Sequence, residues 1–312
     1  MKKITVLLVL MLLCLTCTSF AEGNAYNEPT LLDQSVLAGL DTHYYLYDRE
    51  FYEAPDTDHP GTVVKIKYNT DLYGEKTYKK YMNVYLPYGY DENGTERYPV
   101  IYFFHGRGCD PTTLIGNEYT KNAFDHMIST GVVPPFILVA PTVYYDARHL
   151  LSDMEIFPRE MREQIMPLVE GTYRTYAETP DEAGFRASRD YRAICGFSMG
   201  SGVTWNLFDD MLDVSYYFMP FSGASADLDA IHAAIDNSKI PFFLYLACGG
   251  PEDGAFEGCV KVANTIAADT DYFSYGTDRE KNNFYFCLSD NVHQDLCSRY
   301  YLFNAFRDVL FQ

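Results

Sequence analysis

The amino-acid sequence predicts an α/β protein with a mostly parallel central sheet that helices cover on both faces. Short apolar runs such as "FILVAP" and "IPFFLYLAC" recur without alternating polar residues, which is typical of strands buried on both faces. Segments with helical apolar spacing separate several of these runs. The chain has 312 residues and is 47% hydrophobic, so it is long and apolar enough for one large globular domain.

The first residues predict an export signal. Lys2 and Lys3 precede an apolar run over residues 4–15, and the small residues that end at Ala21 fit a cleavage site. The run is too short for a membrane helix, and no later segment approaches the roughly 20 apolar residues that such a helix needs. We therefore expect residues 1–21 to be removed and the mature protein to be secreted, without a membrane span.

The sequence pattern changes near residue 61. Residues 22–60 are polar, Tyr-rich and weakly patterned, which indicates an N-terminal extension, whereas residues 61–312 carry the periodic segments of the main domain. Strands with β-branched and aromatic residues are expected first, and a proline interrupts the first long amphipathic helix. The expected strands lie within 61–68, 79–90, 98–108, 136–141, 191–200, 214–223, 240–250 and 283–293, and the expected helices within 155–176, 202–212 and 294–312.

Charge and cysteine content narrow the classes of partner. The formal net charge of −19 argues against nucleic acid or an acidic surface, since both would repel the chain, and leaves neutral polymers and small molecules. Six cysteines follow the signal segment, in no Cys-x-x-Cys or Cys/His cluster that would indicate a metal. Export permits disulfides, but six cysteines allow fifteen pairings, so the sequence does not predict their connectivity. Cys195, at the end of an apolar run, is expected to be a buried thiol.

The segment "CGFSMGSG" contains the pattern Gly-x-Ser-x-Gly around Ser198. The pattern alone is weak, but here an apolar strand precedes it and a helical segment follows it, as a nucleophile elbow requires. In such an elbow, side chains at Gly196 and Gly200 would collide with neighbouring backbone, and the serine is exposed above the sheet. The context therefore favours Ser198 as a catalytic nucleophile over a turn serine.

A serine nucleophile needs a base and an acid, which in α/β-hydrolases follow it along the chain in the order acid, then histidine. Of the two later histidines, His232 lies in a helical pattern, whereas His293 directly follows the last strand, where the base belongs. The acid should follow the preceding strand, where "GGPEDG" offers two candidates. We take Asp253 as the first choice and Glu252 as the second.

An oxyanion formed at Ser198 needs two preorganised N–H donors. One is expected to be the backbone N–H of Met199, and the other to come from the loop around Gly106 and Arg107, after the strand "VIYFFHG". The Arg107 side chain either adds positive charge near the substrate or is an ordinary exposed arginine. His105 precedes the nucleophile and is expected to hold this loop by hydrogen bonds.

Several motifs in order resemble the esterase D-like group of carbohydrate esterases, which includes secreted feruloyl and acetylxylan esterases: "VYLPYGYDENGTERYPVIYFFHGRG", "SRDYRAICGFSMGSGVTW", "YYFMPFSG" and the "CGGPEDGAF" and "LSDNVH" segments. The resemblance covers roughly residues 60–310. It implies an α/β-hydrolase fold, a catalytic triad of Ser198, Asp253 and His293, and no cofactor or metal. The sequence departs from the family pattern at two points. The "GGPEDG" loop is longer, so Glu252 remains an alternative acid, and Ser201 stands in place of a second glycine.

The leading hypothesis is a secreted serine esterase that removes hydroxycinnamoyl or acetyl groups from a plant polysaccharide such as xylan through an acyl-enzyme. An acyltransferase with the same triad and a non-catalytic carbohydrate-binding protein of this fold are the alternatives. An aryl ester needs a flat apolar slot, for which Tyr144 and Tyr145 are the favoured residues. Trp205, the one tryptophan of the chain, is either a further wall of this slot or part of the core.

Overall fold

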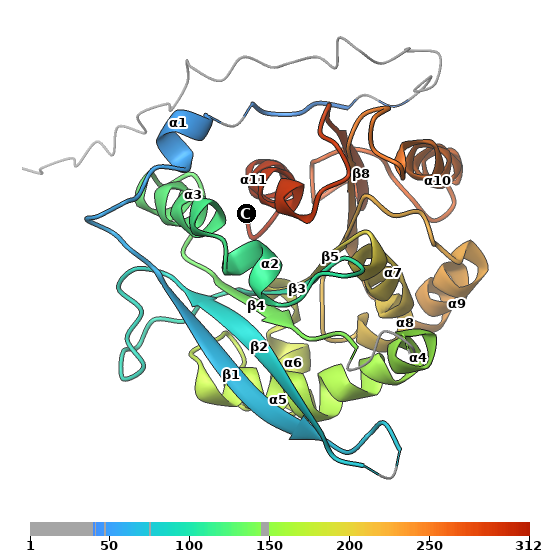
Figure 1. Ribbon diagram of the computed structural model, residues 1–312. Coiled ribbons are helices and arrows are strands. Elements are labelled where there is room, and N and C mark those ends of the chain that lie inside the picture. The colour runs from blue at the N-terminus through green and yellow to red at the C-terminus, as the bar shows by residue number, and fades with distance from the viewer. Residues whose placement is uncertain (1–39, 41, 47, 75, 145–149) are drawn as a thin grey trace, which may run out of the picture.

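A twisted eight-stranded sheet runs through the centre of the computed structural model, which describes residues 40, 42–46, 48–74, 76–144 and 150–312 (Figure 1). The strand order is β1-β2-β4-β3-β5-β6-β7-β8, in which β2 runs antiparallel to β1 and β4 while all pairs from β4 to β8 are parallel. The strands are β1 Thr62–Thr70, β2 Tyr78–Leu86, β3 Val100–Phe104, β4 Ile137–Pro141, β5 Arg192–Phe197, β6 Tyr217–Phe221, β7 Phe243–Cys248 and β8 Phe284–Leu288. All eight expected strands are present, and the predicted α/β class is confirmed.

Helices cover both faces of this sheet, because the central strands are apolar on both sides. In β3, Tyr102 and Phe104 point into one buried cluster while Ile101 and Phe103 point into the other. One face carries α4 Leu150–Glu160, α5 Met166–Thr172, α6 Glu182–Ala187, α7 Met199–Asn206, α8 Phe208–Met211, α9 Leu228–Ser238 and α10 Phe256–Ala268; the other carries α1 Arg49–Tyr52, α2 Thr112–Ile115, α3 Glu118–Ser129 and α11 Ser298–Asp308.

The long helix expected over residues 155–176 begins and ends earlier along the chain than predicted. It begins at Leu150 and ends at Thr172, and a π-helical segment, Met161–Ile165, joins α4 to α5. The N–H of Met166 bonds to the carbonyl of Met161, five residues back. Pro167 then has no N–H to donate, so this wider turn lets the helix continue past the proline.

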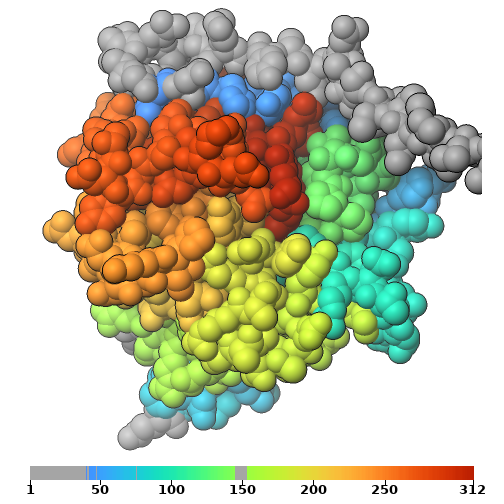
Figure 2. Space-filling view, turned by 180° about the vertical axis from the view of Figure 1, so that it is seen from behind, coloured from blue at the N-terminus to red at the C-terminus, as the bar shows by residue number. Residues whose placement is uncertain are grey.

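The described part of the N-terminal extension packs against the C-terminal elements. His43 Nε2 lies 2.7 Å from Asp308 Oδ1, and Glu53 Oε1 accepts a hydrogen bond of 2.8 Å from Arg299, so both partners lie on α11. Figure 2 shows the blue segment against the red one on the surface. The predicted boundary at residue 60 therefore separates segments that are in contact. The expected signal segment, 1–21, lies outside the described residues.

Candidate active site

Ser198 sits in a strained turn between β5 and α7. Its φ of 55° and ψ of −110° are rare for a residue with a side chain, and its N–H is held by a 2.8 Å hydrogen bond to Phe221 O. A Cβ on Gly196 would lie 2.2 Å from Gly200 O, and one on Gly200 would lie 2.0 Å from Phe104 O. Only glycine fits at both positions, so the local backbone forces the serine to project from the end of β5.

The sheet topology brings His293 and Asp253 to this serine, because both follow the carboxyl ends of parallel strands. His293 Nε2 lies 2.9 Å from Ser198 Oγ, and its Nδ1 lies 2.6 Å from Asp253 Oδ1. The ring is thus bonded through one nitrogen to a hydroxyl and through the other to a carboxylate. This is the arrangement in which a histidine can take the serine proton while the carboxylate fixes its tautomer.

Asp253, rather than Glu252, is the carboxylate in contact with His293. Asp253 is only 2% exposed, and its carboxylate accepts hydrogen bonds from Ser222 Oγ at 2.7 Å and from the N–H of Ala255 at 2.9 Å. Glu252, one residue earlier, is exposed. His232, the other candidate base, lies on α9 with its ring stacked on Tyr272 at 4.1 Å.

The loop after β3 offers a narrower choice of oxyanion donor than the sequence suggested. The N–H of Gly106 already donates to Asp295 Oδ2 at 2.9 Å, so the N–H of Arg107 is the candidate that follows it. The N–H of Met199 is at the first position of α7, where a helix supplies no acceptor four residues back. His105 Nδ1 lies 3.0 Å from Gly106 O, in agreement with its expected loop contact, and burial lowers the pKa of His105, which favours the neutral ring.

Asp295 is the residue of this site that the sequence reasoning missed. It follows His293 by two residues, in a 3-10 turn (Asp295–Cys297), and is 7% exposed. Burial raises the pKa of this carboxyl, although it accepts the Gly106 N–H and lies beside Cys109. Asp295 therefore ties the loop of the base to the loop of the oxyanion donors. Its sequence context, "HQDLC", is ordinary loop sequence, and only the three-dimensional contact identifies it.

The residues expected to bind substrate have different surroundings. Tyr144 lies beside the oxyanion loop, with its hydroxyl accepting from Gly108 N at 3.3 Å and its ring 5.7 Å from that of His105. Tyr145 lies outside the described residues. Trp205 is only 6% exposed and packs in the core of this face, with its indole N–H 3.5 Å from Gly223 O. Arg107 is exposed.

Three further findings concern the described residues alone. No cluster of three or more His, Cys, Asp or Glu side chains in them is arranged to hold a metal ion. None of their helices is both long and apolar enough to cross a membrane. The six cysteines among these residues are free thiols, and Cys195 is among the buried ones.

Comparisons with known proteins identify relatives of this chain. The Esterase family model matches residues 78–205. The chain is 33% identical over 82% of its length to endo-1,4-beta-xylanase Y of Acetivibrio thermocellus, and 24% identical over 71% of its length to an endo-1,4-beta-xylanase/feruloyl esterase of Xylanibacter ruminicola. It spans only 24% and 29% of these two relatives, which are much longer proteins.

Solved structures cover the chain more fully. The feruloyl esterase module from Clostridium thermocellum, complexed with sinapinate, superposes with a TM-score of 0.75 at 31% identity, covering 87% of this chain and 95% of that one. A ferulic acid esterase from Anaeromyces mucronatus, in complex with ferulic acid, superposes with a TM-score of 0.66 at 19% identity, covering 85% and 96% of the two chains. The second likeness bears on the fold alone.

Proposed function

We propose that this chain, which belongs to the esterase family of α/β-hydrolases and is a carboxylic ester hydrolase, cleaves hydroxycinnamoyl esters such as feruloyl esters on xylan. One observation carries the proposal: Ser198 projects from a strained elbow with His293 Nε2 2.9 Å from its hydroxyl oxygen. The substrate class is supported by the likeness to a feruloyl esterase module over nearly its whole length. The acetyl ester of the same polysaccharide is the alternative substrate.

The proposed reaction proceeds through an acyl-enzyme. Ser198 Oγ attacks the ester carbonyl carbon while His293 Nε2 takes the hydroxyl proton, and Asp253 stabilises the resulting imidazolium. The N–H groups of Met199 and Arg107 stabilise the negative charge on the carbonyl oxygen. His293 then donates its proton to the departing sugar oxygen as the carbon–oxygen bond breaks. Water, deprotonated by His293, attacks the acyl-enzyme and releases the acid and free Ser198.

The first test measures kcat/KM for methyl ferulate and for acetylated xylan on one preparation. Ser198→Ala and His293→Ala should each lower ester turnover by about a thousandfold or more while circular dichroism and thermal unfolding stay unchanged. Purified Ser198→Ala with near wild-type turnover would refute the assignment of the nucleophile. Good turnover of acetylated xylan without turnover of methyl ferulate would make the enzyme an acetyl esterase.

The sequence of residues 1–21 supports export, which would bring the enzyme to a polysaccharide outside the cell. Expression of the full chain in a bacterial host, followed by N-terminal sequencing of the exported protein, tests this part of the proposal. Cleavage near Ala21 is expected.

A further inference from the structure

A cavity of about 440 Å³ lies one helical turn from the nucleophile, on the face of the sheet that carries α4, α7, α8 and α9. These helices lie together in Figure 1. The volume is within the range of roughly 300–1,000 Å³ that is usual for small-molecule sites. Its walls are Met154, Glu155, Gly202, Trp205, Asn206, Phe208, Asp209, Ser225, Asp227, Ala230 and Ile231.

The cavity extends away from the reacting serine. Gly202 follows Ser198 by four residues and Asp209 follows it by eleven, which at 1.5 Å per residue corresponds to about 6 Å and about 16 Å along the helices. Neither Ser198 nor His293 lines the cavity. An occupant of the cavity is therefore separated from the ester carbonyl at Ser198 by a distance of this order. A polymer chain is long enough to span that distance, whereas a single acyl group covers less of it.

The cavity combines an apolar wall with an acceptor-rich rim. Trp205, Phe208 and Ile231 are buried and form the apolar side, whereas Asn206, Asp209 and three other polar residues are exposed: Glu155, Ser225 and Asp227. The Asn206 amide is oriented by its 3.0 Å hydrogen bond to Met154 O. Among the described residues that line the cavity, none is Lys, Arg or His.

This chemistry suits a neutral sugar. Carboxylate and amide oxygens accept hydrogen bonds from hydroxyl groups, and the apolar wall, in which the edge of the largely buried Trp205 takes part, can contact the C–H groups of a sugar ring. The three carboxylates, of Glu155, Asp209 and Asp227, would repel an anionic ligand. Resting on the proposed function, we infer that the cavity binds a pentose unit of the polysaccharide that carries the ester.

The first experiment uses Trp205 as its own reporter, because the chain has a single tryptophan. Ser198→Ala protein is titrated with unesterified xylo-oligosaccharide while tryptophan emission is recorded under excitation that spares tyrosine. We expect a saturable change in emission. No change up to millimolar oligosaccharide, with wild-type esterase activity intact in the parent protein, would overturn the inference and leave the proposed function standing.

The second experiment separates sugar from acyl recognition. Asp209→Ala should raise KM for a feruloylated xylo-oligosaccharide by about fivefold, the equivalent of one lost hydrogen bond, with kcat retained. The effect should be confined to this substrate, because methyl ferulate carries no sugar. The neighbouring Asp210→Ala is the matched control, since its carboxylate does not line the cavity.

The other possible results of these experiments would contradict either the sugar-binding cavity or the proposed function. Equal losses on both esters in Asp209→Ala would show that the cavity takes the aryl group, which overturns the inference. Equal KM changes in the two aspartate variants would show a general charge effect and would overturn it as well. Wild-type protein that cleaves neither ester would instead refute the proposed function.

Discussion

The carboxylate of Asp253 accepts hydrogen bonds from several groups besides the imidazole of His293. Its two carboxylate oxygens meet His293, the Ser222 hydroxyl and the N–H groups of Ala255 and Gly249, the last at 3.2 Å. These donors replace water around a carboxylate that is almost fully buried. The acid is therefore held in a fixed orientation toward the imidazole, and its exposed neighbour Glu252 has no comparable support.

The first prediction follows from this contrast. Asp253→Asn should lower kcat for methyl ferulate by about a thousandfold or more, because the amide cannot hold the imidazole in the required tautomer. Glu252→Gln should leave kcat within about twofold of wild type. Steady-state kinetics on the two purified variants checks this, and a larger loss in Glu252→Gln would show that the longer acid loop had been misassigned.

Asp295 supports a second prediction. Its carboxylate bonds to the Gly106 N–H and so holds the loop of Arg107, whereas the hydrogen bonds of His293 go to Ser198 and Asp253. Asp295→Ala frees the Gly106 N–H and should lower kcat by about tenfold to a hundredfold, with little change in KM, since a misplaced oxyanion donor acts on the transition state. Asp295→Asn keeps an oxygen that can accept the Gly106 N–H, so it should retain most of the activity.

The pH dependence of stability should distinguish Asp295→Asn from the wild type. Burial raises the pKa of Asp295 above the ordinary value of 3.8, so the folded state favours the protonated carboxyl. Its contribution to stability is complete below 3.8 and is lost as the pH rises through the folded-state pKa. Asp295→Asn should therefore lose less stability than wild type over that rise, as measured by thermal unfolding at a series of pH values. Parallel curves for the two proteins would contradict this reading.

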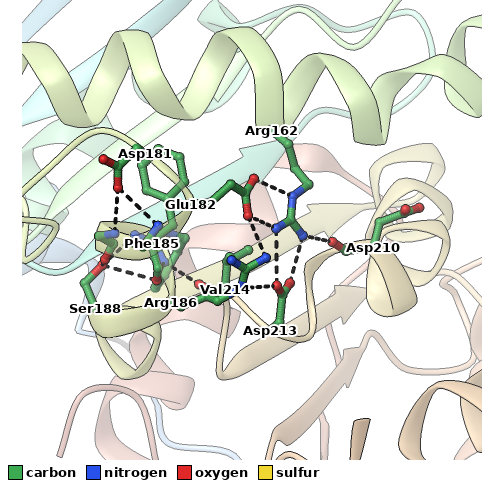
Figure 3. Close-up of polar contacts among 12 residues, drawn as sticks. Arg162, Asp181, Glu182, Phe185, Arg186, Ser188, Asp210, Asp213 and Val214 are labelled. Carbon is green, nitrogen blue, oxygen red and sulfur yellow. Dashed lines mark hydrogen bonds and ion pairs between the residues drawn. The ribbon is translucent and has the colours of Figure 1, made fainter. Parts of the chain in front are cut away.

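At the scale of elements, an ion-pair network joins three helical segments on the face that carries the cavity. Arg162, in the π-helical segment, pairs with Glu182 of α6 and with Asp213 at 2.8 Å, after α8; Arg186 pairs with the same two carboxylates (Figure 3). Arg162 also donates to the backbone carbonyl of Asp210 on α8. The network thus contacts α8 at Asp210, the residue that follows the cavity residue Asp209.

The third prediction follows from this ion-pair network. Arg162→Met keeps the apolar stem and removes the guanidinium, so it should lower the free energy of unfolding by about 1–2 kcal/mol, less at high salt. Arg159→Met is the control on α4, because its exposed partner Glu163 lies 2.8 Å away in an isolated pair, and its effect should be smaller. Urea titrations at low and high salt measure both. Equal effects would show that the network adds nothing beyond isolated pairs.

The elements that the sequence predicted are those with a strong local pattern. Strands β3 to β8 are buried along their whole length and mostly apolar, and β1 and β2 are rich in β-branched and aromatic residues. The elbow is recognisable from two glycines around Ser198, so the strands and the elbow could both be predicted from the local sequence. The helices α2, α3 and α10 were not predicted, and Asp295 was missed, because its role arises from a contact with Gly106, 189 residues away. The candidate base and acid were predicted from their position after strands, and the structure places His293 between Ser198 and Asp253, whereas the sequence alone left Glu252 as an alternative.

At the scale of the whole molecule, the segment before β1 braces the end of the sheet that carries the base. His43 lies 2.7 Å from the Tyr285 hydroxyl of β8 as well as from Asp308 of α11. Tyr44 accepts a hydrogen bond of 3.3 Å from Asn291, two residues before His293. The extension therefore contacts both the C-terminal helix and the loop of the candidate base.

The last prediction tests whether residues 61–312 form a self-sufficient domain. A chain limited to these residues lacks Glu53, which pairs with the buried Arg299, and His43, which is one partner of the buried Asp308. Removing the partner of a buried charge lowers the free energy of unfolding by about 3–5 kcal/mol. Its Tm should fall by about 10 °C or more relative to residues 22–312, and kcat should fall with it, because Asn291 loses its contact near His293.

A point variant keeps this prediction testable if the shortened chain does not fold. Glu53→Gln removes only the charge opposite Arg299, so it should lower Tm in the same direction by a smaller amount, whereas Glu50→Gln on the exposed side of α1 should not. Calorimetry of the three proteins gives the order. A shortened chain with unchanged Tm and unchanged kcat would show that the contacts of residues 42–54 contribute neither stability nor positioning, and that the boundary at residue 60 is a true domain boundary.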